Sequence, residues 1–360
     1  MYPNTVTRIC VLALTLAWGC ALTAAAQTTA APAAAVQTMR IVGGLAGLNQ
    51  YTHNEEPFWT QELSRLSQGR YTAEIFPFDR AGVPGSEMLR LLQLGVVPFG
   101  TALLSNISAQ YPEYAAPDLA GLNPDMATLR KTVSAFRPFL EKSMRDRQGI
   151  EVLAIYTYPA QVVFCKKAMA SLADLKGRRV RVSSATQSDF MASLGAVPVL
   201  VSFAQLMPSL ASGNTECAVT GTMSGNSLKL YEVTHYIHTL PVTWGLAVFG
   251  ANLAAWSALP GDLRALLSHE LPKLERAIWA ESEKETIEGL ACNRGLPECR
   301  VERKGKMTEV ALTADDERLR KSVFQNKVLP RWLQRCNGRC ESMWNQTIGP
   351  AHNLMAPTAK

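Results

Sequence analysis

Apolar positions along the chain alternate between the two-residue period of β-strands and the three-to-four-residue period of α-helices. Strands are predicted at residues 39–43, 71–78, 99–104, 151–156, 160–166, 179–182, 217–220 and 245–251. Helices are predicted from Pro57, at 85–94, after Asp125, through Phe190 and Leu194, at 203–212 and at 263–278. Such alternation over about 200 residues predicts an α/β fold with mainly parallel sheets covered by helices. The length of 360 residues is enough for two such sheets.

Helix starts are marked by a few polar residues and prolines. Asp125 is a predicted N-cap for the helix that follows it, and Ser202 with Gln205 forms a predicted capping box. Residues 49–56 are polar and are interpreted as a loop, with Pro57 in the first turn of the next helix. Ligands of open α/β sheets bind beyond the carboxyl ends of strands, so strand-end residues are the candidates for a site.

The first residues have the pattern of a secretory signal peptide. Arg8 precedes an apolar run at 9–16, and small residues end in Ala24, Ala25 and Ala26 before Gln27. The apolar run is shorter than the ~20 residues of a spanning helix. Cleavage before Gln27 is favoured over lipidation at Cys20, since residues 17–19 match a lipoprotein site poorly. We expect a signal peptide at 1–26, a flexible leader at 27–37 and a periplasmic protein.

Composition and charge describe an ordinary globular protein. The chain is 47% hydrophobic and 18% charged, with a net charge of +6 that falls to +5 without residues 1–26. The basic residues are scattered, which argues against a nucleic-acid partner. Six cysteines remain after export, an even number that suggests disulfides in an oxidising compartment. The disulfide candidates are Cys165, Cys217, Cys292, Cys299, Cys336 and Cys340.

Cysteine pairing stays open at this point. A bridge from Cys165 to Cys217 is plausible between neighbouring strands of one lobe. The four later cysteines could pair locally or cross-pair, and we expect them to tie the C-terminal segment to the long helix. A zinc site is the alternative, but the spacings match no common zinc motif and the histidines are dispersed. No metal or other cofactor is expected.

One run of residues resembles a known family. The segment 173–182 reads ADLKGRRVRV, and residues 194–199 read LGAVPV. This pattern is similar to that of the solute-receptor subunits of TRAP-type (tripartite ATP-independent periplasmic) transporters, the DctP-like proteins. Weaker matches in the same order are SQGR at 67–70, LASG at 210–213 and WSALP at 256–260. Residues 213–221 depart from the family pattern, which suggests a divergent subgroup.

The resemblance implies a periplasmic-binding-protein-like architecture. Two α/β lobes would flank a ligand cleft and be joined by hinge strands and a long lobe-spanning helix. We expect the first lobe at 38–158 with 247–286, and the second at 159–246 with 287–360. The implied function is a monomeric receptor that binds a small organic acid and delivers it to a TRAP membrane permease. A periplasmic ligand sensor that feeds a signalling receptor is the alternative.

The predicted ligand-binding residues are led by Arg181. In a strand, Arg179 and Arg181 point to one face and Val180 to the other, and a guanidinium grips a carboxylate with two parallel hydrogen bonds. The family match assigns Arg181 as the carboxylate anchor, against the alternative of a solvated basic face. The other predicted ligand-binding residues are Gln161, Phe203, Thr220, Asn226, Asn49, Gln50 and Tyr51.

An enzyme is not expected. His235 and His238 could suggest a metal or a base, but no carboxylate or cysteine stands at ligand spacing beside them. The sequence has no G-x-S-x-G elbow, no H-E-x-x-H motif and no phosphate-binding loop. These absences remove the common signatures of hydrolases, metallopeptidases and nucleotide-binding enzymes.

Overall fold

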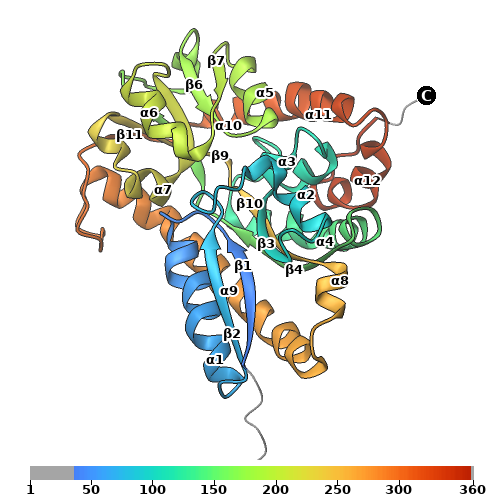
Figure 1. The fold of residues 1–360 in the computed structure, drawn as a ribbon. Helices are drawn as coiled ribbons and strands as arrows, with labels where there is room; N and C mark the ends of the chain where they lie inside the picture. Colours follow the sequence, from blue (N-terminus) through green and yellow to red (C-terminus); the bar gives the residue numbers. More distant parts are fainter. Residues whose placement is uncertain (1–35, 358–360) are drawn as a thin grey trace, which may run out of the picture. The chain divides into compact units, whose positions relative to one another are not determined.

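The computed structural model describes residues 36–357, and these form one compact unit. The predicted signal peptide at 1–26 and nearly all of the predicted leader at 27–37 lie outside the described residues. In Figure 1 the blue strands β1 and β2 lie in the lower part of the view, and β6 and β7 lie at its top. They belong to two different sheets.

The first sheet has five strands in the order β2-β1-β3-β10-β4. Their bounds are Gln37–Gly43 (β1), Tyr71–Pro77 (β2), Phe99–Leu103 (β3), Ile150–Thr157 (β4) and Leu246–Asn252 (β10). Strand β1 runs parallel to β2 and β3, whereas β10 is antiparallel to β3 and β4. All five strands lie where the apolar pattern predicts them.

The second sheet has six strands in the order β11-β9-β5-β8-β6-β7. Their bounds are Gln161–Cys165 (β5), Arg179–Val182 (β6), Val197–Leu200 (β7), Cys217–Gly221 (β8), Tyr236–Thr243 (β9) and Thr308–Val310 (β11). Strands β7, β9 and β11 are not among those predicted. Both sheets are mixed rather than mainly parallel, since β5 and β10, each the first strand after the chain changes sheet, are antiparallel to their neighbours.

Helices cover both sheets. In the part of the chain before β5 they are η1 Gln50–Glu55, η2 Phe58–Glu62, α1 Leu63–Leu66, η3 Gly85–Glu87, α2 Met88–Gln93, α3 Leu104–Ile107, η4 Pro112–Asp118 and α4 Met126–Gln148. Between β5 and β10 they are η5 Leu172–Leu175, α5 Ala185–Ser193, η6 Phe203–Gln205, α6 Leu206–Ala211, α7 Thr222–Ser227 and η7 Leu230–Glu232. After β10 they are α8 Leu253–Ser257, α9 Gly261–Arg294, α10 Ala314–Val323, η8 Phe324–Val328, α11 Leu329–Arg335, α12 Cys340–Gln346 and α13 Ile348–His352.

Helix α4 begins and ends at residues suited to those positions. The Asp125 side chain accepts a hydrogen bond from the backbone N–H of Thr128 at 2.7 Å, which confirms the predicted N-cap. The apolar stripe from Leu129 to Leu140 is buried against the first sheet, and Gly149 ends the helix in the left-handed conformation at φ +63°.

Two helix starts differ from the prediction. Residues 50–55, interpreted as part of a loop, are the first turns of a helical run that continues to Leu66. Pro57 therefore lies inside the run, where it has no N–H to donate, and wide π-type turns on both sides accommodate it. The predicted capping box at Ser202 is also wrong, since that side chain makes no capping bond. Capping boxes occur instead at Ser171 with Asp174 and at Thr313 with Asp316.

Helix α9 contacts elements of both sheets. In its middle, the Trp279 indole N–H donates to the carbonyl of Ile155 on β4 at 2.8 Å. Toward its end, Asn293 donates to the carbonyl of Thr222 at the start of α7 at 2.8 Å. Gly289 packs against the backbone of α7 so closely that a Cβ atom there would lie 2.3 Å from the amide nitrogen of Met223. The expected lobe-spanning helix is thus present.

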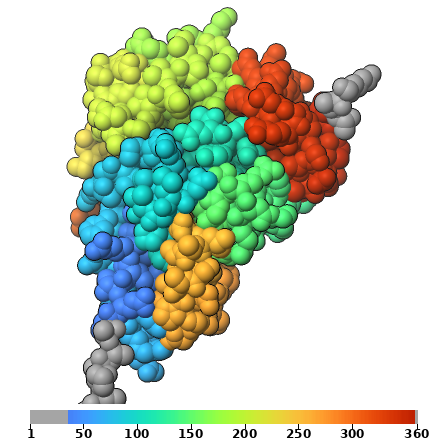
Figure 2. All heavy atoms as spheres, turned by 45° about the vertical axis from the view of Figure 1, so that its right-hand side comes forward, coloured from blue at the N-terminus to red at the C-terminus, as the bar shows by residue number. Residues whose placement is uncertain are grey.

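The C-terminal helices also contact elements from both halves of the chain. Trp332 on α11 donates to the carbonyl of Pro112 at 2.7 Å, and Arg335 forms an ion pair with Asp189 on α5 at 2.6 Å. In Figure 2 the red C-terminal segment lies against both the green region of α4 and the yellow-green half that carries the second sheet. This packing buries Trp332 and Trp344 completely.

The six cysteines form three disulfides. Cys165 bonds to Cys217, which stands directly opposite it in the register of β5 and β8, as predicted. The other bonds, Cys292–Cys299 and Cys336–Cys340, close short local loops. The expectation that they tie the C-terminal segment to the long helix is wrong, because each pair lies within a few residues of the chain.

Candidate functional site

A cavity of about 500 Å³ is lined by residues from both halves of the chain. Within residues 36–357, its walls combine apolar side chains with many hydroxyl groups and only two charged residues, Asp79 and Arg181. Its apolar wall includes Leu45, Leu48, Phe78, Val83, Leu103, Leu200 and Phe203, and its polar wall includes Ser86, Ser105, Asn106, Gln161, Ser183, Ser202, Thr220 and Ser224. The volume and this mixture are typical of a small-molecule site.

Arg181 is the single cation that the described part of the chain contributes to the cavity lining, and it is only 2% exposed. Its Nε donates to the carbonyl of Val201 and its Nη1 to the carbonyl of Val219, both at 2.8 Å. These two bonds fix the plane of the guanidinium. They do not involve Nη2 or the second N–H of Nη1. Burial lowers the pKa of Arg181 to about 10, and no carboxylate of the described residues offsets that burial. A charged, oriented and uncompensated guanidinium therefore lines the cavity at neutral pH.

Three other predicted ligand residues line the same cavity. Gln161 begins β5, Thr220 lies near the end of β8, and Phe203 begins the short helix η6 with its ring half-buried. They come together because each stands at or next to the end of an element that faces the cavity. Arg179 lies outside the lining. It is exposed and donates to the carbonyls of Gly213 and Asn214.

The remaining predicted ligand residues are not part of the cavity lining. Asn226 is buried and donates to the carbonyl of Arg303 at 3.1 Å. Asn49 donates to Glu285 on α9, and Gln50 donates to the buried Glu55 at 3.0 Å. The Tyr51 hydroxyl donates to the carbonyl of Ile75 at 3.3 Å, and burial raises the pKa of Tyr51 to about 12. Because residues 50–55 are helical, the side chains of Gln50 and Tyr51 contact partners within the protein.

Two chain crossings connect the sheets next to the cavity. The backbone N–H of Tyr158, in the first crossing, donates to the carbonyl of Gly245, in the second, at 3.0 Å. Asp118 accepts hydrogen bonds from the N–H groups of Trp244 and Gly245 at 3.0 and 2.7 Å. Gly245 has φ +82°, and a Cβ atom there would lie 2.7 Å from the Gln161 side-chain nitrogen. Asp118 therefore fixes the backbone of the second crossing by two hydrogen bonds. Position 245 requires glycine, because any side chain there would be strained and would contact Gln161 too closely. The sequence carried no signal for this role, because Asp118 stands 126 residues before Trp244.

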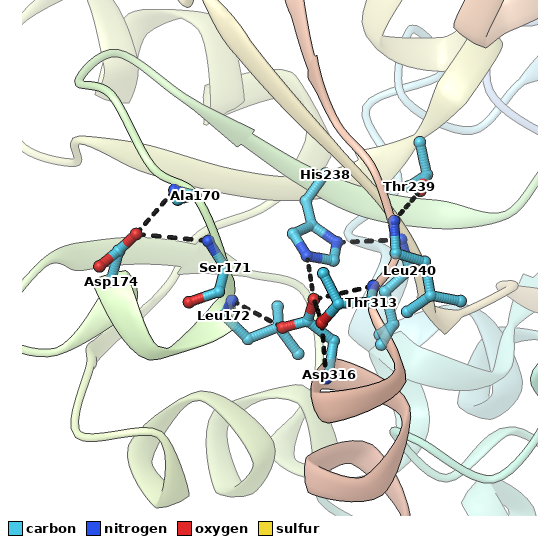
Figure 3. Close-up of polar contacts among 10 residues, drawn as sticks. Ala170, Ser171, Leu172, Asp174, His238, Thr239, Leu240, Thr313 and Asp316 are labelled. Atoms are coloured by element: carbon cyan, nitrogen blue, oxygen red, sulfur yellow. Dashed lines mark hydrogen bonds and ion pairs between the residues drawn. The ribbon is translucent and has the colours of Figure 1, made fainter.

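His238 is part of a buried polar cluster in the second sheet (Figure 3). Its Nδ1 accepts the N–H of Leu240 at 3.1 Å, so Nε2 carries the proton, 3.4 Å from the Asp316 carboxylate. Asp316 also accepts from Leu172 at 3.0 Å and from Thr313. Burial lowers the pKa of His238, and the hydrogen bonds to Asp316 hold the pKa of that carboxyl below its usual value despite its burial. The pair joins β9, η5 and α10, and neither residue lines the cavity.

Within residues 36–357, no group of three or more potential metal ligands occurs. In the same part of the chain, no helix is both long enough and apolar enough to cross a membrane.

Three carboxyl groups, of Glu55 and Glu285, which are buried, and of Asp118, which is half-buried, predict an unusual pH dependence. Loss of hydration raises the pKa of Glu55, of Asp118 and of Glu285 to about 7. In the unfolded chain such groups titrate near pH 4, so between these values the folded form holds protons that the unfolded form has lost. Stability therefore falls as pH rises through 7. Burial lowers the pKa values of His238 and His352. These two groups therefore make stability rise with pH below about 6.5, which opposes the effect of the carboxyl groups there.

We expect the free energy of unfolding to fall by about 2 kcal/mol between pH 6.5 and 8.5 from these three groups. Thermal unfolding of the ligand-free protein at both values measures it. The variant Asp118→Asn removes one of the three groups and should reduce the fall by about a third. A melting temperature that stays level or rises over this interval contradicts the prediction.

Comparison with known families places the chain among binding proteins. Residues 42–295 match the family described as bacterial extracellular solute-binding protein, family 7. An uncharacterised protein of Sinorhizobium fredii, y4mM, is 24% identical over 297 residues, which are 81% of this chain. The chain spans about half the length (54%) of that curated relative.

Solved structures share the fold at low sequence identity. An extracytoplasmic solute receptor of Bordetella pertussis that binds pyroglutamic acid superimposes with a TM-score of 0.77, at 22% identity, over 88% of this chain and 100% of its own. A TRAP periplasmic solute-binding protein of Desulfovibrio salexigens with bound orotic acid gives 0.74, at 19% identity, over 88% and 97%. One from Sulfitobacter with bound β-D-galacturonate gives 0.71, at 17% identity, over 86% and 99%.

Proposed function

Because the chain belongs to family 7 of the bacterial extracellular solute-binding proteins, we propose that it is the receptor of a TRAP-type transporter. In this role it binds one small organic acid outside the cytoplasm and delivers it to a membrane permease. The two lobes are residues 38–158 with 247–286 and residues 159–246 with 287–360, and the receptor acts as a monomer after removal of residues 1–26. Members of the family are solute-binding proteins and not enzymes.

One observation carries the proposal of an acidic ligand. Arg181 is buried, charged and oriented by two backbone carbonyls, yet no carboxylate of the described residues neutralises it. An uncompensated buried charge is costly, and a ligand carboxylate would remove that cost with two charge-assisted hydrogen bonds. The free N–H groups of Nη1 and Nη2 lie in the plane that such a two-pronged contact needs.

The rest of the lining favours a particular kind of carbon skeleton on the ligand. With one cation and one carboxylate, Asp79, the described lining of the cavity offers no second positive group to a dicarboxylate. The hydroxyl groups of Ser86, Ser202 and Thr220 and the ring of Phe203 suit a polar or cyclic carbon skeleton. Pyroglutamate, orotate and galacturonate, the ligands of the three solved structures described above, all carry a single carboxyl on a ring. We propose that a cyclic or hydroxylated monocarboxylate is the ligand class.

Thermal unfolding with a panel of acids tests the proposal. The panel contains L-pyroglutamate, orotate, D-galacturonate and the dicarboxylate succinate, and L-pyroglutamide is the matched neutral control. An acid present at a hundred times its dissociation constant should add about 2.7 kcal/mol to the free energy of unfolding. We expect at least one monocarboxylate to stabilise the protein and the amide to have no effect. Equal stabilisation by acid and amide, or by none of these compounds, contradicts the proposed ligand class.

A further inference from the structure

Three polar side chains form a small network behind the ligand cavity. Gln161 comes from β5, Gln187 from α5 and Thr243 from the end of β9. Gln187 is 1% exposed and Thr243 is 4% exposed. Both line a recess of about 20 Å³ and neither lines the main cavity, whereas Gln161 lines both. Gln161 is therefore the member that a ligand can reach.

The backbone determines which way the Gln187 amide is turned. Its Oε1 accepts the N–H of Ser183 at 2.8 Å, and a backbone N–H can act only as a donor. The other end of the Gln187 amide is then Nε2, which donates to Gln161 Oε1 at 2.6 Å and to Thr243 Oγ1 at 2.7 Å. The Thr243 hydroxyl in turn donates to Gln161 Oε1 at 3.1 Å.

Gln161 is consequently turned as well. Its oxygen accepts two hydrogen bonds from residues of the recess, so its Nε2 is the end that remains for the main cavity. Among the described residues, no hydrogen bond from this nitrogen is formed. It lies beside Gly245, where a side chain would displace it. The amide thus supplies a donor to the cavity that Arg181 also lines.

We propose that Gln187 is a positioning residue that holds the Gln161 amide with its nitrogen toward the ligand. This inference rests on the proposed function, because it takes the main cavity to be the ligand-binding site. Gln187 does not touch the ligand in this arrangement. Its role is to make Gln161 a hydrogen-bond donor, so that the site selects acids that present a further acceptor oxygen beside or within the carboxylate that Arg181 holds.

A test without ligand uses hydrogen exchange of glutamine side-chain amides, followed by NMR on the glutamine-labelled protein. In the wild type, the Gln187 amide protons should exchange slowly and those of Gln161 quickly, since only the former are hydrogen-bonded. In Gln187→Glu, compared with the wild type at a pH at which the new carboxyl is ionised, the carboxylate still accepts from Ser183 but cannot donate. Gln161 should then turn its nitrogen toward it, and its amide protons should become protected. Fast exchange at Gln161 in both proteins overturns the proposal. If Gln187→Glu does not fold, the double-mutant cycle with Gln187→Met described next decides the question instead.

A test with ligand uses a double-mutant cycle on Gln161→Met and Gln187→Met, with pyroglutamate, orotate and galacturonate as probes in calorimetry. If Gln187 acts through Gln161, each single variant should lose about tenfold in affinity, and the double variant should bind no more weakly than Gln161→Met alone. The proposal is overturned if the affinity loss of the double variant is the product of the two single losses, or if Gln187→Met binds with wild-type affinity. If no probe binds the wild type, the proposed ligand class fails, whereas amide exchange still decides the orientation of Gln161.

Discussion

Replacing Arg181 with alanine is expected to abolish high-affinity binding of the acid ligand while the protein remains folded. The ligand carboxylate would then be buried without a partner, which typically costs about 3–5 kcal/mol, a loss of two to nearly four orders of magnitude in affinity. The ligand-free protein should lose little stability, because Arg181 is a buried charge with no carboxylate partner of its own among the described residues. Calorimetry with the best acid of the panel, after a check of the melting temperature, measures both effects.

Two further variants separate charge from geometry. Arg181→Lys keeps the positive charge but cannot hold the two carbonyls of Val201 and Val219 and a two-pronged carboxylate at once, so it should also bind poorly. Arg179→Ala is the matched control two residues away on the same strand, and its exposed side chain contacts only backbone carbonyls. We expect nearly unchanged affinity for it. Near-native affinity in Arg181→Ala would place the anchor elsewhere.

Removal of the Cys165–Cys217 disulfide is expected to give the largest loss of stability among the three disulfides. Its cysteines are 52 residues apart. In the chain-entropy description, closing a loop of that length raises the free energy of the unfolded chain, and so stabilises the folded protein, by about 4 kcal/mol. Both cysteines are fully buried between β5 and β8, the strands that carry Gln161 and Thr220. Denaturant unfolding of the double variant Cys165→Ala/Cys217→Ala measures the loss.

The control for this prediction is the variant Cys292→Ala/Cys299→Ala. That disulfide joins cysteines only seven residues apart, for which the same relation gives about 2 kcal/mol. The two double variants remove equal numbers of sulfur atoms and differ in loop length. Equal losses would mean that packing, and not chain entropy, governs the contribution of these bonds.

Much of the fold could be predicted from the local pattern of apolar residues. The strands β1 to β6, β8 and β10 and the helices α4 and α9 lie where that pattern indicates, because a strand or helix that buries one face needs a regular apolar repeat. The strand β7 has the short sequence VPVL and is largely exposed, so no buried face marks it. The strand β11 has only three residues and pairs with β9, which lies 72 residues earlier in the chain.

The candidate site could be predicted only in part. Arg181, Gln161, Phe203 and Thr220 line the cavity. Arg181 and Thr220 stand near the carboxyl ends of their strands, where an α/β fold binds its ligands, and Gln161 begins β5, which is antiparallel to β8 and so starts at the same edge. Polarity alone predicts residues 49–51 as a loop at the cavity, and this prediction is wrong. Their polar groups instead satisfy buried partners such as Glu55 and Glu285, which no local pattern reveals.

The sequence by itself determined the order of most strands and helices, the family pattern around 173–199 and the face of the strand on which Arg181 stands. These features depend on neighbouring residues, whose side chains alternate with the regular period of the backbone. Only the tertiary structure decided that Arg181 meets two carbonyls and no carboxylate, that Asp118 clamps Gly245, that His238 meets Asp316, and which end of the Gln161 amide faces the cavity. Most of these contacts join residues distant in the chain. The partner that a buried polar group finds is set by packing between elements and not by the period within one.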